Sequence, residues 1–135
     1  MFSRVLTQTL VSAGVMAVLV GCSAGRVSQA TPKGESPVVI YVSNQTGEVN
    51  PVNIKVSIDQ DSILNQDFLC GTGHNWSSFK LSLKEGRHQL VVTSSNGDAG
   101  LDVVFTVDKP TWLVIDYWGK NHFQLVISYE PVGFA

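Results

Sequence analysis

Charged residues are scarce in this chain, and the basic ones are scattered. Only 15% of the 135 residues are charged, whereas 44% are hydrophobic. Disordered chains combine low hydrophobicity with high charge, so this composition argues against disorder and fits one globular domain. The net charge is −2, and no run of Lys or Arg is present. Clustered basic residues displace counterions from phosphates and attract proteins to acidic lipids, so we expect no nucleic-acid partner and no membrane recruitment by charge.

The sequence also lacks the uninterrupted apolar run, about 18 residues or longer, that is typical of a transmembrane helix. Its first 21 residues instead place one basic residue, Arg4, before an uncharged stretch that ends in the apolar run 15–20. Polar residues such as Thr7 and Gln8 interrupt this stretch. That layout is typical of a secretory signal peptide. We therefore predict that residues 1–21 direct export.

The signal peptide ends in Leu19-Val20-Gly21-Cys22. This resembles the lipobox of bacterial lipoproteins, in which apolar and small residues precede an obligatory Cys. The resemblance implies a diacylglyceryl group on the Cys22 sulfur, cleavage before Cys22, and in many bacteria a further acyl chain such as palmitate on the new amino group. Several acyl chains hold a protein stably on a lipid bilayer. The alternative is an ordinary signal peptide that happens to contain a Cys.

The residues after the lipobox predict where the domain would be held. Ser23 stands where an Asp tends to retain Gram-negative lipoproteins at the inner membrane. The resemblance therefore implies the cell envelope, and the outer membrane facing the periplasm if the source is Gram-negative. Residues 22–36 are small and polar and include Pro and Gly, so we predict that they form the lipidated end of a flexible tether.

No segment after residue 36 shows a sustained helical period, and short β-rich runs alternate with turn residues. In residues 52–58 every second residue is Val or Ile, and polar residues lie between them. This period of two places one face of a strand on the core. Asn96-Gly97 predicts a hairpin turn, because both residue types tolerate positive φ. We expect strands near residues 38–43, 52–58, 63–69, 76–83, 88–92, 101–107, 112–118 and 123–129.

The spacing of these runs and turns is typical of a β-sandwich. We predict that residues 37–135 form a seven- or eight-stranded antiparallel β-sandwich of the immunoglobulin-like kind, with an open barrel as the alternative. The segment Leu83-x-x-Gly86-x-His88-x-Leu90 resembles the turn-and-strand signature of bacterial immunoglobulin-like and transthyretin-like modules. This resemblance implies architecture alone, because the antibody-type Cys…Trp…Cys spacing is absent.

Motifs of catalysis and cofactor binding are missing from the chain. It has no Gly-x-Ser-x-Gly elbow of a hydrolase. Gly71-x-Gly73 lacks the third Gly of a dinucleotide loop. Asp59-x-Asp61 begins like a calcium loop but continues with apolar residues, so we interpret it as a hairpin turn. We expect no enzymatic activity and no cofactor.

Once the Cys of the lipobox is lipidated, Cys70 is the sole remaining thiol, and His74 follows four residues later. A free Cys is more commonly a buried packing residue than a nucleophile. Zinc needs three or four ligands at paired spacings, and His88 and His122 are distant in the sequence, so we expect no metal site. His88 shares a face with Leu90, which predicts a hydrogen-bonded His at the core boundary. A small thiol-dependent enzyme or redox-reactive protein centred on Cys70 and His74 is the alternative function.

The aromatic residues give the remaining lead to a binding site. If the face with Leu113, Ile115 and Tyr117 packs on the core, the opposite face presents two Trp residues with one Asp between them. Flat rings beside a carboxylate suit sugar rings or a protein hot spot, although buried packing is the more common role of a Trp. We predict a non-catalytic binding or assembly module for an envelope protein or a glycan. The predicted binding residues are Trp112, Asp116, Trp118 and Trp76.

Overall fold

The computed structural model describes residues 31–71 and 75–134, and Thr31–Ala135 form one compact unit. The predicted signal peptide, Cys22 and the tether as far as residue 30 lie outside the described residues, as does His74. Within the described ranges, the structure contains no helix long and apolar enough to cross a membrane. The first strand begins at Glu35, where it pairs with Lys84. The predicted end of the tether at residue 36 is therefore two residues too late.

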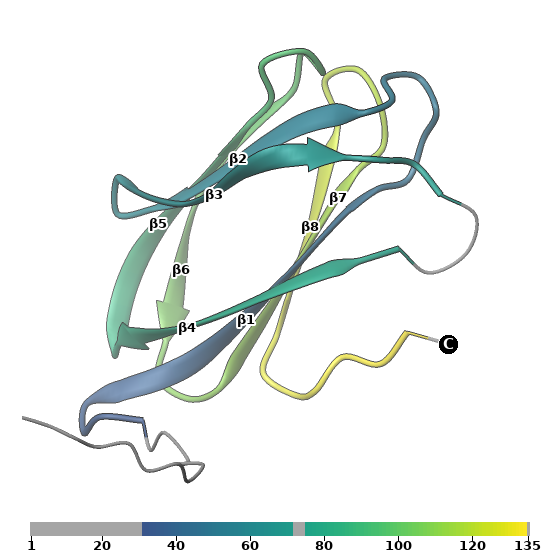
Figure 1. Cartoon of the computed structure of the whole chain (residues 1–135). Helices are drawn as coiled ribbons and strands as arrows, with labels where there is room; N and C mark the ends of the chain where they lie inside the picture. The colour runs from purple at the N-terminus through teal and green to yellow at the C-terminus, as the bar shows by residue number, and fades with distance from the viewer. Residues whose placement is uncertain (1–30, 72–74, 135) are drawn as a thin grey trace, which may run out of the picture. The chain divides into compact units, whose positions relative to one another are not determined.

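The described chain forms eight strands in two four-stranded sheets (Figure 1). This confirms the prediction of an all-β fold with two layers. The alternation of apolar and polar residues fits the observed strands best in Val52–Ile58, whose bounds agree with the predicted run at both ends. The strands are β1 (Glu35–Asn44), β2 (Val52–Ile58), β3 (Asp61–Phe68), β4 (Ser77–Lys84), β5 (Gly86–Thr93), β6 (Gly100–Val107), β7 (Thr111–Tyr117) and β8 (Phe123–Ser128).

The first sheet has the strand order β4-β1-β7-β8, and the second has β3-β2-β5-β6. Five of the six strand pairs are antiparallel, but β1 and β7 run parallel, from Val38 beside Thr111 to Asn44 beside Tyr117. The prediction of a wholly antiparallel sandwich is wrong at this pair. A short hairpin forces antiparallel pairing, whereas strands β2 to β6 separate β1 from β7 along the chain, which leaves their relative direction free.

The core lies between the two sheets and is built from every second residue of the strands. All four inward residues of β2 are no more than 1% exposed. Burial of one such Val or Ile side chain contributes about 1.5–3 kcal/mol. On β7 the inward residues are Leu113, Ile115 and Tyr117, so the structure decides between two apolar faces that the sequence left open.

Two of the predicted turns join antiparallel strands. The turn between β2 and β3 holds Asp59 and Gln60 at φ 52° and 72°, as in the type I′ hairpin. This confirms that Asp59-x-Asp61 is a hairpin turn. Asn96-Gly97 lies in the connection between the antiparallel strands β5 and β6, as predicted, but this connection spans residues 94–99, and its positive φ, 51°, falls on Asp98 instead of on either predicted residue. The buried Tyr117 hydroxyl donates to the Gly97 carbonyl at 3.0 Å, which ties this turn to the first sheet.

Candidate functional site

The outer face of the first sheet carries a second, smaller set of buried side chains. On β7, Val114 and Asp116 point away from the core because they alternate with its inward residues, yet they are only 5% and 8% exposed. Val114 does not belong to the core cluster. Val126, its partner on the edge strand β8, is 42% exposed. A cover therefore lies over β7 and ends before β8.

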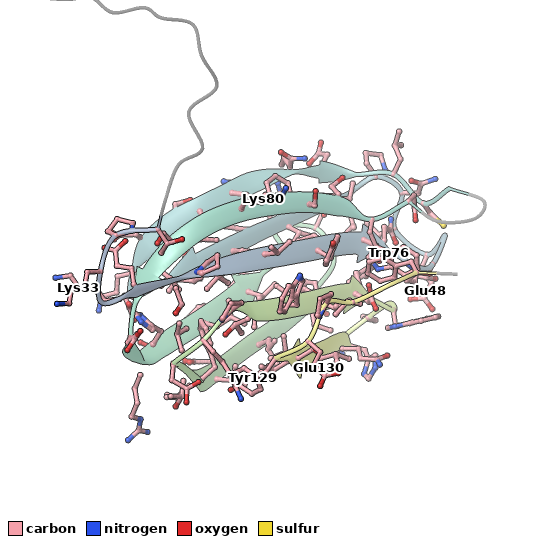
Figure 2. The ribbon with its side chains drawn as sticks, turned by 90° about the horizontal axis from the view of Figure 1, so that it is seen from below. Lys33, Glu48, Trp76, Lys80, Tyr129 and Glu130 are labelled. Atoms are coloured by element: carbon pink, nitrogen blue, oxygen red, sulfur yellow. The ribbon has the colours of Figure 1, made fainter. Side chains whose placement is uncertain are left out.

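The C-terminal segment, Tyr129–Phe134, runs across this face. Figure 2 shows it leaving the labelled Tyr129 and Glu130 and passing the first sheet toward Trp76. Its last ring, Phe134, stacks on the Trp76 indole, with the ring centroids 4.1 Å apart and the planes at 17°. The same ring meets Tyr41 of β1 edge-to-face at 4.8 Å and 78°. Tyr41 and Trp76 together form an aromatic slot that the C-terminal segment fills.

A buried carboxylate holds one wall of the aromatic slot. Asp116 Oδ1 accepts hydrogen bonds from Trp76 Nε1 at 2.7 Å and from Ser43 Oγ at 2.6 Å. Ser43 lies beside Asp116 in the parallel register of β1 and β7, so the corrected strand pairing is what brings these two side chains together. Gln45 Nε2 donates in turn to Ser43 Oγ at 2.7 Å. The carboxylate thus fixes the plane of the indole.

The four predicted binding residues lie in different surroundings. Trp76 precedes β4 and joins Asp116 through its indole N–H. Trp112 is half-buried on the outer face of β7, and Trp118, just past the end of β7, is 47% exposed. Asp116 lies on the outward face, but it is buried and bonded to two donors. It is a positioning group rather than an open carboxylate.

Sequence reasoning missed Tyr41 and Phe134. Tyr41 alternates with the inward residues of β1, so the period of two places its ring outside the core. That is the signal that could have found it. Phe134 lies in a segment with Pro131 and Gly133 and has no strand pattern. The role of Phe134 is seen only in its contacts with Trp76 and Tyr41 in the folded structure.

The thiol alternative rests on a pair that the structure describes only in part. Cys70 is free and partly exposed, and its backbone N–H donates to Asn50 Oδ1 at 2.8 Å. It also forms an isolated bridge with Asn44 at the end of β1. His74 lies outside the described residues.

His88 forms a separate polar cluster at the edge of the core. Its Nδ1 lies 2.5 Å from Asp59 Oδ2 and its Nε2 lies 2.6 Å from the Lys84 carbonyl. Burial lowers the pKa of His88, but the bonds to Asp59 and Lys84 and the charge of Asp59 outweigh it, so the pKa is raised. In residues 31–71 and 75–134, no group of three or more His, Cys, Asp or Glu side chains is placed to hold a metal ion.

Comparison with protein families, with curated proteins and with solved structures finds no match for this chain. Stacked rings, a fixed indole and a covering peptide segment are the elements of non-covalent recognition.

Proposed function

We propose that this chain is a lipid-anchored protein of the bacterial envelope whose β-sandwich domain binds a partner without catalysing a reaction. The observation that supports binding is the aromatic slot, which already accommodates an extended piece of polypeptide through ring contacts. The lipobox that ends in Cys22 supports the anchor. The partner in this proposal is another envelope component, a protein or a glycan.

The architecture is part of the proposal. Immunoglobulin constant-type domains pair their first strand with the second, in sheets ABED and CFG. Here β1 lies between β4 and β7, and β2 lies between β3 and β5 in the other sheet. Of the two modules that the sequence resembles, we therefore propose the transthyretin-like kind. Fold alone assigns no function.

The anchor is tested by expressing the full chain in a bacterium supplied with labelled palmitate. The proposal predicts that the chain is labelled and sediments with membranes, and that Cys22→Ala removes both properties. Cys70→Ala is the matched control, because it removes the other Cys and leaves the lipobox intact. Equal labelling of the Cys22→Ala variant would contradict the anchor.

Binding is tested in the same cells by photo-crosslinking before lysis. A photoreactive residue at position 118 places the probe beside the covered face, and one at exposed Lys55 of β2 places it on the opposite sheet. The proposal predicts one reproducible crosslinked partner from position 118 and none from position 55. Identical crosslinks from both positions, or none from either, would contradict a binding role for this face.

A further inference from the structure

The C-terminal segment is fixed firmly at its start. The Tyr129 hydroxyl donates to the Thr106 carbonyl of β6 at 3.2 Å, and Lys109 lies over the Tyr129 ring at 5.1 Å. Ser128 and Glu130 exchange two hydrogen bonds, at 2.8 and 3.1 Å. These contacts tie the start of the segment to both sheets.

The end of the segment is held differently. In the described part of the chain, residues 131–134 make no hydrogen bond to the sheet, and the ring contacts of Phe134 hold them in place. Pro131 has no N–H to donate, so the segment cannot pair as a further strand along its whole length. A segment with few backbone hydrogen bonds opens at low cost compared with the strands beneath it.

We propose that the aromatic slot is a binding site for an extended peptide with an aromatic side chain, and that Phe134 is its exchangeable occupant within the same chain. This inference rests on the proposed binding function and names the chemistry of the partner. A partner peptide would insert its own ring between Tyr41 and Trp76 and release residues 131–134, while Tyr129 stays bound. Residues 131–134 supply the template for the partner: a Pro-containing, uncharged stretch that ends in an aromatic residue.

The polar groups around the slot favour a peptide over a glycan. Sugar recognition combines a flat ring with hydrogen bonds to hydroxyl groups. The Trp76 Nε1 is already bonded to Asp116, and Asp116 Oδ1 accepts from Ser43 as well. The occupant of the slot contacts one ring by stacking and the other in a perpendicular arrangement, and both geometries suit an aromatic side chain.

The test measures binding of a fluorescent peptide with the sequence of residues 130–135 to the full chain in detergent. The tethered segment competes at a high effective concentration, so opening the slot must strengthen binding in trans. We expect Phe134→Ala to raise the apparent affinity for the peptide by about tenfold or more over the unaltered chain, because a larger fraction of the molecules is binding-competent. Equal affinity of the two proteins, or no binding to Phe134→Ala, would overturn the proposal.

Variants of the slot locate the bound peptide. Adding Trp76→Ala to the Phe134→Ala variant should abolish binding, whereas adding Val104→Ala, at an exposed position of β6 in the second sheet, should leave it unchanged. If the Trp76→Ala protein does not fold, Tyr41→Ala takes its place. Binding that survives the loss of either ring would also overturn the proposal. The crosslinking at position 118 does not depend on peptide exchange. If the peptide does not bind, the broader binding function therefore still stands. If the crosslinking finds no partner, the binding function fails whatever the peptide does.

Discussion

Trp76 donates its indole N–H to Oδ1 of Asp116, 40 residues further along the chain, at 2.7 Å. The bond joins the start of β4 to β7 across β1, which lies between them in the first sheet. It also sets the ring on which Phe134 stacks. Asp116, on the outward face of β7, therefore supports the covered surface.

Removal of that support should destabilise the domain. Asp116→Ala leaves the donors of Ser43 and Trp76 without their acceptor, and a buried unsatisfied donor costs about 1–3 kcal/mol. Asp116→Asn keeps an acceptor oxygen and should lose less. Urea unfolding measures both, with exposed Asp61→Ala as the control, expected to change stability by no more than about 0.5 kcal/mol. An Asp116→Ala protein as stable as the control would contradict the assigned role.

Loss of the Phe134 ring should affect the covered face and spare the core. We expect Phe134→Ala to reduce the free energy of unfolding by about 1–2 kcal/mol, the scale of an exposed-edge aromatic contact. Phe123→Ala, which removes a ring from the core cluster, should cost about 3–5 kcal/mol. Chemical unfolding of both variants separates the two cases. Equal losses would mean that Phe134 belongs to the core structure.

Stability should fall as the pH rises above 6.5, because His88 loses its proton. Both of its ring nitrogens face acceptors, Asp59 Oδ2 and the Lys84 carbonyl, and only the protonated imidazolium has two N–H donors. The folded-state pKa of His88 is raised above its ordinary value of 6.5. Its stabilising contribution is therefore fully present below pH 6.5 and is lost as the pH rises through the raised pKa.

Asp59 sets the acidic limit of the same interaction. Its pKa is lowered, first by the backbone N–H of Gln89 and then by His88, so its contribution is present above its ordinary 3.8 and is lost as the pH falls through the lowered pKa. Thermal melts across this pH range should show that His88→Gln removes the loss of stability above pH 6.5. His122→Gln, at an exposed position, should retain it. A decline that persists in His88→Gln would place its origin elsewhere.

Gly97 should tolerate no side chain. A Cβ there would lie 2.6 Å from Ser94 Oγ, 2.8 Å from Val52 Cγ2 and 3.0 Å from Tyr117 Cε2. Overpacking of this kind typically costs about 1–3 kcal/mol. Gly47→Ala, where no atom lies within 4 Å, is the matched control and should be close to neutral in thermal unfolding. Equal melting temperatures for Gly97→Ala and the control would show that the turn can move aside.

The sequence predicts where the strands of this fold lie better than it predicts which strands pair with one another. Alternation in β2 assigns the inward face correctly, because a period of two depends only on which face is buried. In β7 both faces are apolar, so alternation left its inward face open. Alternation carries no information about which strand lies alongside. The parallel pairing of β1 with β7, and with it the bond between Ser43 and Asp116, is a tertiary property.

The candidate site was predictable in part for the same reason. Trp76 and Asp116 drew attention as an aromatic ring and a carboxylate, and the alternation placed Asp116 outward only on the condition that the face with Leu113 packs on the core. Its burial and its two hydrogen bonds did not follow from the alternation, because they depend on Ser43 and Trp76, which are distant in the sequence, and the Phe134 ring that stacks on Trp76 lies in a segment without a regular pattern. Local patterns miss contacts made by an irregular segment that folds back on a distant strand.

The most direct test of the account follows the indole N–H signal of Trp76 by NMR in the full-length Phe134→Ala protein while the peptide of residues 130–135 is added. We predict that the Trp76 signal shifts until the added peptide saturates the protein, and that the signals of Trp112 and Trp118 do not shift. A Trp76 signal that does not move, or a shift confined to Trp118, would contradict the claim that the slot of Tyr41 and Trp76 is a peptide-binding site.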